Sequence, residues 1–379
     1  MADVEKTIII AYQVEIESNS LFQKLAKSFS EKLNVIAFGV SRHANKKNEL
    51  QYRKIRFKDK EISYFEVSTN LRSGQGIKNL FGTVGYQFLL FRKLCELRKD
   101  IDFVYAIDFL MALPMFFFSL LFHKRFIYHV ADPILAYNIP NILTLLAKMI
   151  DRAMFKHAYK IVVPHENRFE YIPASCREKT LVVYNSPEDL ITQCDKSDQQ
   201  IKHSKKLKLA FFGVLSDGRF INEILEIVSK NDDWLELHIG GNGPLENRVR
   251  EYSEKYENIF FYGKVSYDKV LCIEKQCDLF FAMYDPSIPN HRVSSPNKVF
   301  EAMMLGKPII VAKGMGIDNL VEQEKIGLTC EYSKEAFESL LKSLDENKMI
   351  MFGKNGRRLY EVRYSWTKAI EALLDAIEP

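Results

Sequence analysis

The sequence is poor in cysteine, and the cysteines it has follow no pairing pattern. The six cysteines form no CxxC pair and no Cys/His cluster with the spacing of a zinc site. We therefore expect reduced thiols, most of them buried, rather than a disulfide framework. The first ten residues, MADVEKTIII, have an acidic start and no apolar signal core. We expect a cytoplasmic protein without a secretion signal.

Long hydrophobic runs are also missing. The longest run, Phe109–Phe122, contains Pro114 and is too short to span a bilayer. We expect it to form a buried helix. The chain has 379 residues, of which 47% are hydrophobic and 27% charged. This length and composition are typical of a globular protein with two domains of ordinary size.

The net charge is only +4, but the charges are unevenly distributed. Between Arg42 and Lys99 there are 14 Lys and Arg against 5 Asp and Glu, a local excess of nine positive charges. This stretch is either an ordinary solvated basic surface or a patch that meets anionic lipid headgroups, where each cation contributes ~1 kcal/mol. A nucleic-acid surface is a weaker third interpretation, because no zinc-finger or RRM signature accompanies the charge. We expect no nucleic-acid partner.

Short apolar, β-branched runs alternate with amphipathic segments along the chain, which predicts an α/β fold with parallel sheets. In the first half, the predicted strands are 7–12, 35–40, 62–67, 102–107, 125–130, 160–164 and 181–184. Residues 191–206 are polar and are predicted to be a linker. After the linker, strands are predicted at 207–212, 235–239, 258–262 and 277–282. The sequence thus predicts two doubly wound, Rossmann-like domains, 1–190 and 207–362.

The stretch Arg292–Ala312, RVSSPNKVFEAMMLGKPIIVA, is predicted to be a helix followed by a buried strand. Ser295 is expected to cap the helix, and Pro296 to occupy its first position. Apolar residues recur at helical spacing and are expected to face a core: Val299, Phe300, Met303 and Met304. Gly306 is expected to end the helix.

A capped helix start is a potential anion site, because free backbone N–H groups and the positive dipole end point outward. Lys298 adds a cation in the first turn. Glu301 lies one turn further on, where its carboxylate can accept hydrogen bonds from two neighbouring hydroxyls such as a ribose diol. The alternative is a plain helix-to-strand connection that carries a surface lysine.

The sequence of residues 295–308, Ser-Pro-Asn-Lys-x-x-Glu-Ala-Met-x-x-Gly-Lys-Pro, resembles the donor-binding segment of GT-B glycosyltransferases, close to family 4. The resemblance implies two domains facing a cleft, and a helix within 363–379 that returns to the first domain. In many of these enzymes a Glu, seven residues and a second Glu mark the site. Glu301 matches the second Glu, but Val293 stands in the place of the first. How the sugar ring is held, and whether the reaction retains configuration, therefore stay open.

The resemblance also implies donor-site roles for residues upstream. Arg219, after Gly213, stands where the family places a basic residue on the donor diphosphate, although an ordinary surface arginine is the alternative. Gly241 and Gly243 match a turn near the donor site, and the turn lacks the third glycine of a dinucleotide fingerprint. The predicted donor site consists of Gly213, Arg219, Gly241, Gly243, Ser295, Pro296, Asn297, Lys298 and Glu301. We expect no metal, and no cofactor besides the nucleotide-sugar substrate: backbone N–H groups at Pro296–Lys298, with Lys298 and Arg219, would stabilise the leaving diphosphate.

Candidate catalytic residues of the first domain stand at the carboxyl ends of predicted strands, where parallel sheets bind ligands. They are Asp108, His129, Asp132 and Glu166. Each is a candidate general base for an inverting reaction, and the sequence does not rank them. The alternatives are helix capping for the two aspartates and a hydrogen-bonded core position for His129.

These features predict a metal-independent glycosyltransferase that moves a sugar from a nucleotide-diphosphate sugar to a hydroxyl of a glycan or lipid-linked acceptor. We expect it to work at the inner face of a membrane, in surface polysaccharide or glycolipid assembly. A nucleotide-sugar epimerase of the same fold and a non-catalytic GT-B partner protein are the alternatives. Product formed from donor alone would indicate the epimerase, because epimerisation needs no acceptor.

Overall fold

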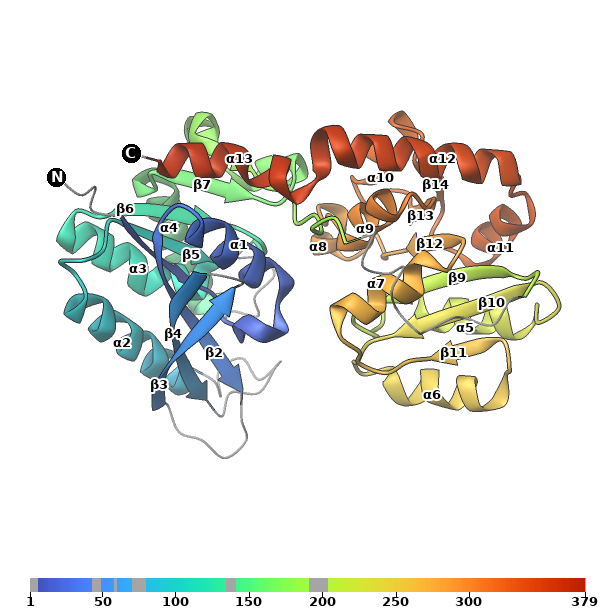
Figure 1. Cartoon of the computed structure of the whole chain (residues 1–379), viewed down its shortest axis with the longest axis horizontal. Helices are drawn as coiled ribbons and strands as arrows, with labels where there is room; N and C mark the ends of the chain where they lie inside the picture. Colours follow the sequence, from blue (N-terminus) through green and yellow to red (C-terminus); the bar gives the residue numbers. More distant parts are fainter. Residues whose placement is uncertain are drawn as a thin grey trace. The chain divides into compact units, whose positions relative to one another are not determined.

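The computed structural model describes residues 6–42, 49–57, 60–69, 80–133, 141–190 and 204–378. The chain divides into two compact units, Met1–Val183 with Ile370–Pro379, and Tyr184–Ala369. Each unit is built around its own sheet with helices on its faces, as Figure 1 shows. The predicted class, two doubly wound α/β units, is confirmed. Residues 191–203 of the predicted linker lie outside the described residues.

The first unit contains an eight-stranded sheet in the order β3-β4-β2-β1-β5-β6-β7-β8. Its strands are β1 Thr7–Ala11, β2 Asn34–Arg42, β3 Glu49–Phe57, β4 Lys60–Thr69, β5 Phe103–Ile107, β6 Arg125–His129, β7 Lys160–Val163 and β8 Thr180–Val182. Only the edge pair β3–β4 is antiparallel. The strand order reverses between β1 and β5. In open parallel sheets this reversal opens a ligand-binding crevice at the carboxyl ends of the strands.

Helices cover both faces of this sheet. They are α1 Ser20–Ser30, α2 Leu80–Glu96, α3 Phe109–Phe122, α4 Asn141–His157 and the last part of α13 Trp366–Ile377. On one face, Leu90 of α2 and Met115 of α3 belong to the same buried cluster as Val104 of β5. On the other face, the ring of Phe29 on α1 packs 5.2 Å from that of Tyr105. Alternate residues of β5 thus face opposite helix layers, as strand geometry requires.

The second unit contains a fully parallel sheet in the order β11-β10-β9-β12-β13-β14. Its strands are β9 Leu207–Phe212, β10 Leu235–Gly240, β11 Ile259–Phe261, β12 Leu279–Ala282, β13 Ile309–Ala312 and β14 Gly327–Cys330. Counted from β9, this is the Rossmann order 3-2-1-4-5-6. The order reverses between β9 and β12, so a ligand is expected beyond the carboxyl ends of these two strands.

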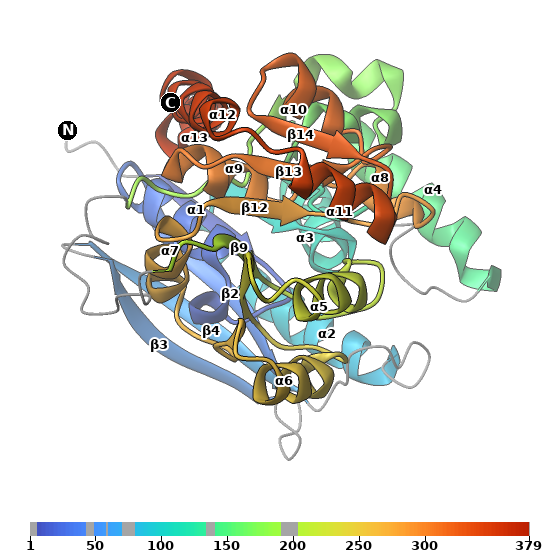
Figure 2. The ribbon, with the colours of Figure 1, turned by 90° about the vertical axis from the view of Figure 1, so that its right-hand side faces the viewer.

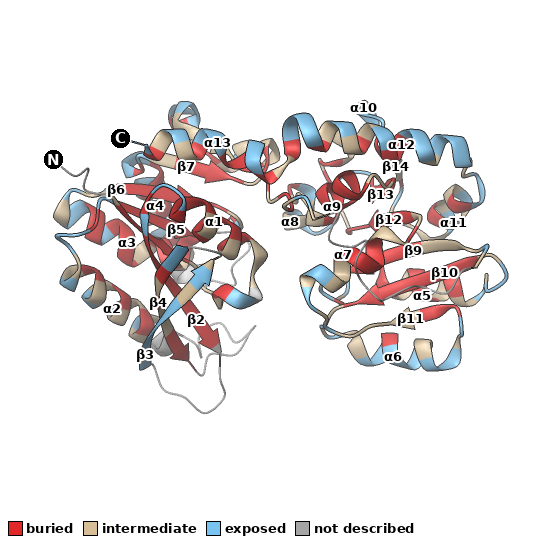
Figure 3. Cartoon of the chain, in the orientation of Figure 1, coloured by how far each residue is buried: buried red, intermediate tan, exposed pale blue. Residues whose placement is uncertain are grey.

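The helices of the second unit are α5 Ile221–Ser229, α6 Glu246–Lys255, α7 Tyr267–Lys275, α8 Pro289–Arg292, α9 Asn297–Leu305, α10 Asp318–Gln323, α11 Lys334–Lys342 and α12 Glu346–Leu359. Figure 2 shows α5, α6 and α11 on one side of the sheet, with α7, α9 and α12 on the other. The strands between them are largely buried (Figure 3). This double covering explains their continuous apolar sequences.

The apolar run Phe109–Phe122 forms α3, as predicted, but it is buried only in part. Its first half packs into the core, whereas Phe117, Leu120 and Leu121 are 49%, 44% and 61% exposed. Within the described ranges, no helix combines the length and apolar character needed to cross a membrane.

Candidate functional site

Helix α9 supplies the centre of the candidate donor site. It begins at Asn297, and Pro296 takes the cap position in an extended conformation with ψ 131°. The prediction that Ser295 caps the helix was therefore wrong. The extended proline separates Ser295 from the helix, and the buried Ser295 Oγ has no hydrogen-bond partner among the described residues.

The rest of α9 follows the prediction. Gly306 ends the helix in the left-handed conformation, with φ 66°. The apolar positions of the inner face are all buried: Val299, Phe300, Met303 and Met304. The first N–H groups of the helix, those of Asn297 and Lys298, have no partner within the helix. Pro296 contributes no N–H to this end because it is an imino acid.

Lys298 is buried although it lies in the first turn of α9, with only 5% of its surface exposed. Its Nζ is 4.3 Å from the centroid of the Phe211 ring on β9. A Cβ built on Gly213 would lie only 2.7 Å from the same Nζ. Glycine at 213 thus leaves room for an ammonium group at the carboxyl end of β9. This position differs from that of a surface lysine on a plain helix-to-strand connection.

The predicted glycines bring the ends of β9 and β10 into direct backbone contact. Gly213 N donates to Gly240 O at 3.0 Å. Gly241 has φ 126°, and a Cβ there would lie 1.8 Å from Gly213 O. A Cβ on Gly243 would lie 2.4 Å from Leu215 O. Close backbone approach therefore requires glycine at 241 and 243, and the structure brings Gly213, Gly241 and Lys298 together.

Arg219 follows β9 and is held in place by a tyrosine that follows β12. Its Nη1 donates to Tyr284 Oη at 3.1 Å, and its guanidinium carbon lies 4.7 Å from the centroid of the Tyr284 ring. The ring of His291 lies 5.2 Å from that of Tyr284. Burial, aided by the charge of Arg219, lowers the pKa of His291, which favours its neutral form. Tyr284 and His291 were not predicted, since Tyr284 lies in the loop after β12, His291 lies in the short helix α8, and neither belongs to a motif.

Glu301 lies in a small cluster of buried polar groups. Its Oε1 accepts a hydrogen bond from Tyr267 Oη at 2.9 Å, and the residue is 6% exposed. Glu274 on α7 is fully buried, and neither carboxyl oxygen has a hydrogen-bond partner among the described residues. Burial and the negative charge of Glu301 raise the pKa of Glu274 well above its usual value, while Lys298 opposes this shift. This shift favours the protonated form of Glu274.

Asn297, also predicted to bind the donor, makes a side-chain contact within the same unit. Its Oδ1 accepts a hydrogen bond from Asn185 Nδ2 at 2.9 Å. This contact ties the start of α9 to the segment that follows β8.

In the first unit, Asp108 follows β5 at the point where the strand order reverses. It has φ 65° and is 6% exposed. Although it precedes α3, its side chain makes no capping hydrogen bond to that helix. Instead, Asp132 N donates to Asp108 Oδ1 at 2.9 Å. Burial and the nearby charge of Asp132 raise the pKa of Asp108 to about 7. This value suits a general base at neutral pH.

Asp132, after β6, lies beside a buried arginine. Its side chain is 51% exposed, and its Oδ1 is 3.6 Å from Arg168 Nη2. Tyr12, which follows β1, has its pKa raised by burial and by the charges of Asp108 and Asp132. Arg168 and Tyr12 were missed by the sequence analysis, because neither stands in a motif and only the fold brings them to the two aspartates.

The other two candidates of the first unit differ from each other. His129 is completely buried, and its Nδ1 lies 2.7 Å from Tyr105 Oη. Burial lowers its pKa to about 3. It is a neutral core histidine, so the structure gives no support to its role as a base. Glu166 has a side chain that is 40% exposed, and its carboxylate lies 3.6 Å from His165 Nδ1.

No group of three or more His, Cys, Asp or Glu side chains in the described ranges is placed to hold a metal ion. The Asp-x-Asp sequence Asp100–Asp102 precedes β5. Asp102 Oδ2 accepts a hydrogen bond from Thr7 N at 2.9 Å. This carboxylate joins the amino ends of two strands, at the opposite edge of the sheet from Asp108.

Known proteins share this fold. Residues 208–347 match the family model described as glycosyl transferases group 1. An uncharacterized glycosyltransferase of Methanocaldococcus jannaschii is 24% identical over 237 residues, and the match spans 59% of this chain and 59% of the relative's length. HepE of Anabaena, solved in complex with UDP, has a TM-score of 0.71 at 14% identity, over 98% of this chain and 99% of that chain. Sucrose-phosphate synthase of Thermosynechococcus elongatus has a TM-score of 0.73 at 12% identity, over 98% of each chain.

The two Rossmann-like units define a GT-B architecture. In the second unit, the start of α9, which carries Lys298, lies where the strand order reverses. Residues 208–347 are thus similar to a group 1 glycosyltransferase domain, and the chain shares the fold of known glycosyltransferases.

Proposed function

We propose that the second unit binds a nucleotide-diphosphate sugar and that the protein transfers this sugar to a hydroxyl of a glycan or lipid-linked acceptor. The position of Lys298 carries this proposal. Its ammonium group lies at Gly213, at the carboxyl end of β9, and its backbone N–H belongs to the open end of α9. A buried cation beside free N–H groups is suited to a diphosphate.

The same groups would stabilise the leaving diphosphate. Arg219, oriented by Tyr284, would add a second cation. Preorganised cations and N–H groups stabilise developing negative charge without reorganisation during the reaction. We propose that these groups serve this purpose without a metal ion. Glu301 would accept hydrogen bonds from the ribose hydroxyls of the nucleotide.

The first unit would bind the acceptor. If the reaction inverts configuration, Asp108 is the best-placed base among the predicted residues. It stands at the carboxyl end of β5, and its pKa of about 7 allows it to accept a proton at neutral pH. Asp132 and Glu166, also predicted as candidate bases, are more exposed, and we propose that they bind the acceptor instead.

We further propose that the first unit contacts an anionic membrane through the exposed side of α2, α3 and α4. Large apolar side chains are exposed along these helices: Val84, Phe88, Phe117, Leu120, Leu121, Leu145, Leu146 and Met149. On α4, the exposed cations Lys148, Arg152 and Lys156 accompany them. Apolar side chains among cations are typical of helices at anionic lipid surfaces. A lipid-linked acceptor and a role in surface polysaccharide assembly are consistent with this contact.

The basic stretch 42–99 is a weaker membrane candidate than the sequence suggested. Several of its described cations form ion pairs. Arg53 pairs with Glu17 and Glu66, and Lys54 pairs with Glu61. These pairs reduce the charge available to lipid headgroups.

Ligand binding and transfer test the proposal. Thermal-shift screening with UDP, ADP, GDP and their glucose derivatives should identify a ligand that raises the melting temperature, because binding to the folded state stabilises it. UDP is the first probe, since the structurally similar HepE was solved with UDP. The identified donor should then yield transfer or hydrolysis products. A folded protein that binds none of these nucleotides would contradict the proposal.

Vesicle flotation tests the membrane contact. The wild-type protein should float with vesicles rich in phosphatidylglycerol, and the triple variant Leu145→Ser, Leu146→Ser, Met149→Ser should not. The control Val362→Ser removes an apolar side chain of the second unit that is 64% exposed. Equal flotation of the triple variant would contradict the assignment.

A further inference from the structure

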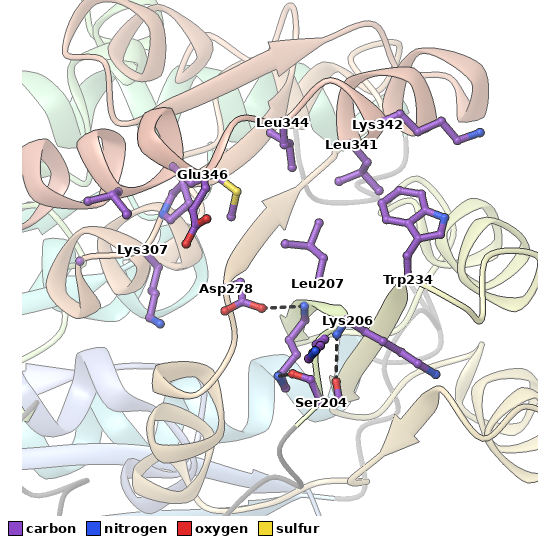
Figure 4. A pocket seen from close by; sticks show the side chains of 16 residues that line it. Ser204, Lys206, Leu207, Trp234, Asp278, Lys307, Leu341, Lys342, Leu344 and Glu346 are labelled. Atoms are coloured by element: carbon purple, nitrogen blue, oxygen red, sulfur yellow. Dashed lines mark hydrogen bonds between the residues drawn. The ribbon is translucent and has the colours of Figure 1, made fainter.

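The second unit has a pocket at the opposite edge of its sheet from the donor site (Figure 4). It has a volume of about 850 Å³ and is lined by residues at the amino ends of β9, β12 and β13, including Leu207, Asp278 and Pro308. This volume is that of small-molecule pockets. Strand β9 runs for six residues from Leu207 to Phe212, and Gly213 follows it. At about 3.3 Å per residue, the pocket is roughly 20 Å from the donor site.

Positive charge dominates the lining. Five lysines contribute to it, at positions 205, 206, 208, 307 and 342, against the two acids Asp278 and Glu346. Asp278 Oδ2 already accepts a hydrogen bond from Lys208 N at 2.9 Å. Burial lowers the pKa of Lys307. The charge of Asp278 opposes this shift, whereas the charges of Lys208 and Lys275 lower the pKa further. An anionic ligand would relieve this repulsion between cations.

The other wall is apolar and includes Trp234, Leu341, Leu344 and Ile350. Trp234 Nε1 donates to Asn231 Oδ1 at 3.1 Å, so the single donor of the indole is used within the protein. The ring therefore offers the pocket an aromatic surface. Figure 4 shows Trp234 and Lys307 on opposite sides of the space, with Leu207 between them. The pocket thus brings lysine side chains and an aromatic ring around one space.

We propose that this pocket binds a phosphorylated small molecule, with its phosphate on Lys208 and Lys307 and its apolar or aromatic part on Trp234. Lysine ammonium groups bind phosphate oxygens through charge-assisted hydrogen bonds. The ring explains why a ligand with an apolar part is expected rather than inorganic phosphate alone. The site is separate from the donor site and does not depend on the proposed function.

Phenyl phosphate is the probe for this site, because it combines both chemical groups. The experiment uses the full chain with Lys298→Ala, so that an anion bound at the donor site does not contribute. Phenyl phosphate should change the tryptophan fluorescence saturably, at constant ionic strength. The same change should be absent after Trp234→Phe, although Trp366 remains as the second tryptophan of the chain. Inorganic phosphate should bind more weakly than phenyl phosphate.

Replacing the cations tests the charged side. The double variant Lys208→Ala, Lys307→Ala should bind phenyl phosphate about tenfold more weakly or worse by calorimetry. The matched control Lys255→Ala, Lys269→Ala removes two lysines outside the lining and should bind as before. Vesicles containing phosphatidic acid provide a further arm. The protein with intact lysines could bind these vesicles but not phenyl phosphate, while the double variant binds neither. This result would assign the cations to a lipid headgroup and overturn the small-molecule site.

Two further results would overturn the proposal. One is phenyl phosphate binding that neither the Lys208/Lys307 double variant nor Trp234→Phe changes. The other is the absence of any calorimetric or fluorescence response in the folded Lys298→Ala protein at millimolar phenyl phosphate. Either result leaves the donor-site proposal untouched, because that site is tested with nucleotides.

Discussion

The ammonium group of Lys298 lies 4.3 Å from the centroid of the Phe211 ring. Phe211 belongs to β9, and Lys298 belongs to the first turn of α9, so this contact holds a cation where the strand order reverses. A Cβ at position 213 would lie 2.7 Å from the same ammonium group, so a side chain there would displace the lysine. Strand, glycine and helix end therefore meet at one place, which we propose as the anion site, and the account of function rests on it.

The glycine at 241 is predicted to be essential for folding of the second unit. Gly241→Ala would place a Cβ 1.8 Å from Gly213 O, at a φ of 126°. Because both partners are backbone, the clash requires the ends of β9 and β10 to separate. We expect a loss of about 3 kcal/mol or more in the free energy of unfolding, measured by urea denaturation.

Gly263→Ala is the matched control for this prediction. Gly263 also has a positive φ, 62°, but a Cβ there meets nothing within 4 Å. Its substitution should cost only about 1 kcal/mol, from the left-handed backbone. Equal losses for the two variants would show that backbone conformation, rather than the close approach of β9 and β10, explains the requirement for glycine.

Tyr284 is predicted to orient Arg219 for the donor diphosphate. Tyr284→Phe removes the hydroxyl that accepts from Arg219 Nη1 but keeps the ring beneath the guanidinium. We expect nucleotide-diphosphate affinity to fall about threefold to tenfold, less than the loss of a full hydrogen bond to a charged group, because the ring still holds the guanidinium. Arg219→Ala should weaken binding further. Titration calorimetry measures both, and unchanged affinity in Arg219→Ala would remove this residue from the site.

Asp108 is predicted to make stability depend on pH. Its pKa is about 7 in the folded protein, because burial favours the protonated form, against an ordinary value of 3.8. Between these values the folded state binds more protons than the unfolded state, so the free energy of unfolding falls as pH rises. The total loss in the free energy of unfolding is on the order of 4 kcal/mol. This loss is absent below about pH 4 and complete above about pH 7.

Asp108→Asn tests this linkage, because asparagine tolerates a positive φ and can still accept the hydrogen bond from Asp132 N. Relative to the wild type, the variant should gain stability between pH 4.5 and pH 8, as measured by urea denaturation at both values. A parallel pH dependence of the two proteins would contradict the raised pKa.

If Asp108 is the base, activity has the opposite pH dependence from its contribution to stability. The carboxylate form is needed to accept the proton of the acceptor, so kcat/KM should rise with pH up to about 7. Asp108→Asn should lower the rate by about 10²–10⁴-fold with little change in donor affinity. An active Asp108→Asn enzyme would instead favour a reaction that needs no base from this residue.

Much of the sheet structure could be predicted because buried parallel strands are short apolar runs. Sequences such as TIIIA in β1 and IIVA in β13 have no other good interpretation. The edge strand β3, ELQYRKIRF, was missed because most of its side chains are exposed and charged. The short β14, GLTC, was missed because it contains glycine and only one large apolar residue.

The site was predictable only where its residues are close in sequence. The spacing of Lys298, Glu301 and Gly306 predicted the length and the end of α9. The hydroxyl of Ser295, however, led to the wrong prediction that this residue caps the helix. Nothing local marks Glu274 as a buried acid beside Glu301, since α7 otherwise carries exposed charges. Arg168 and Tyr12 reach the aspartates of the first unit through strand order, which the sequence alone did not supply.

The most direct test of the account is calorimetric titration of its best nucleotide-diphosphate ligand, with UDP as the first candidate, into the wild type and into Lys298→Met. Methionine keeps an unbranched apolar side chain and removes the charge that lies over the Phe211 ring. Lys255→Met, at an exposed position on α6, is the control. We predict that Lys298→Met weakens binding by about 30-fold or more, the cost of removing one partner of a buried charge pair, while Lys255→Met binds as the wild type does. Wild-type affinity in a folded Lys298→Met protein would contradict the account.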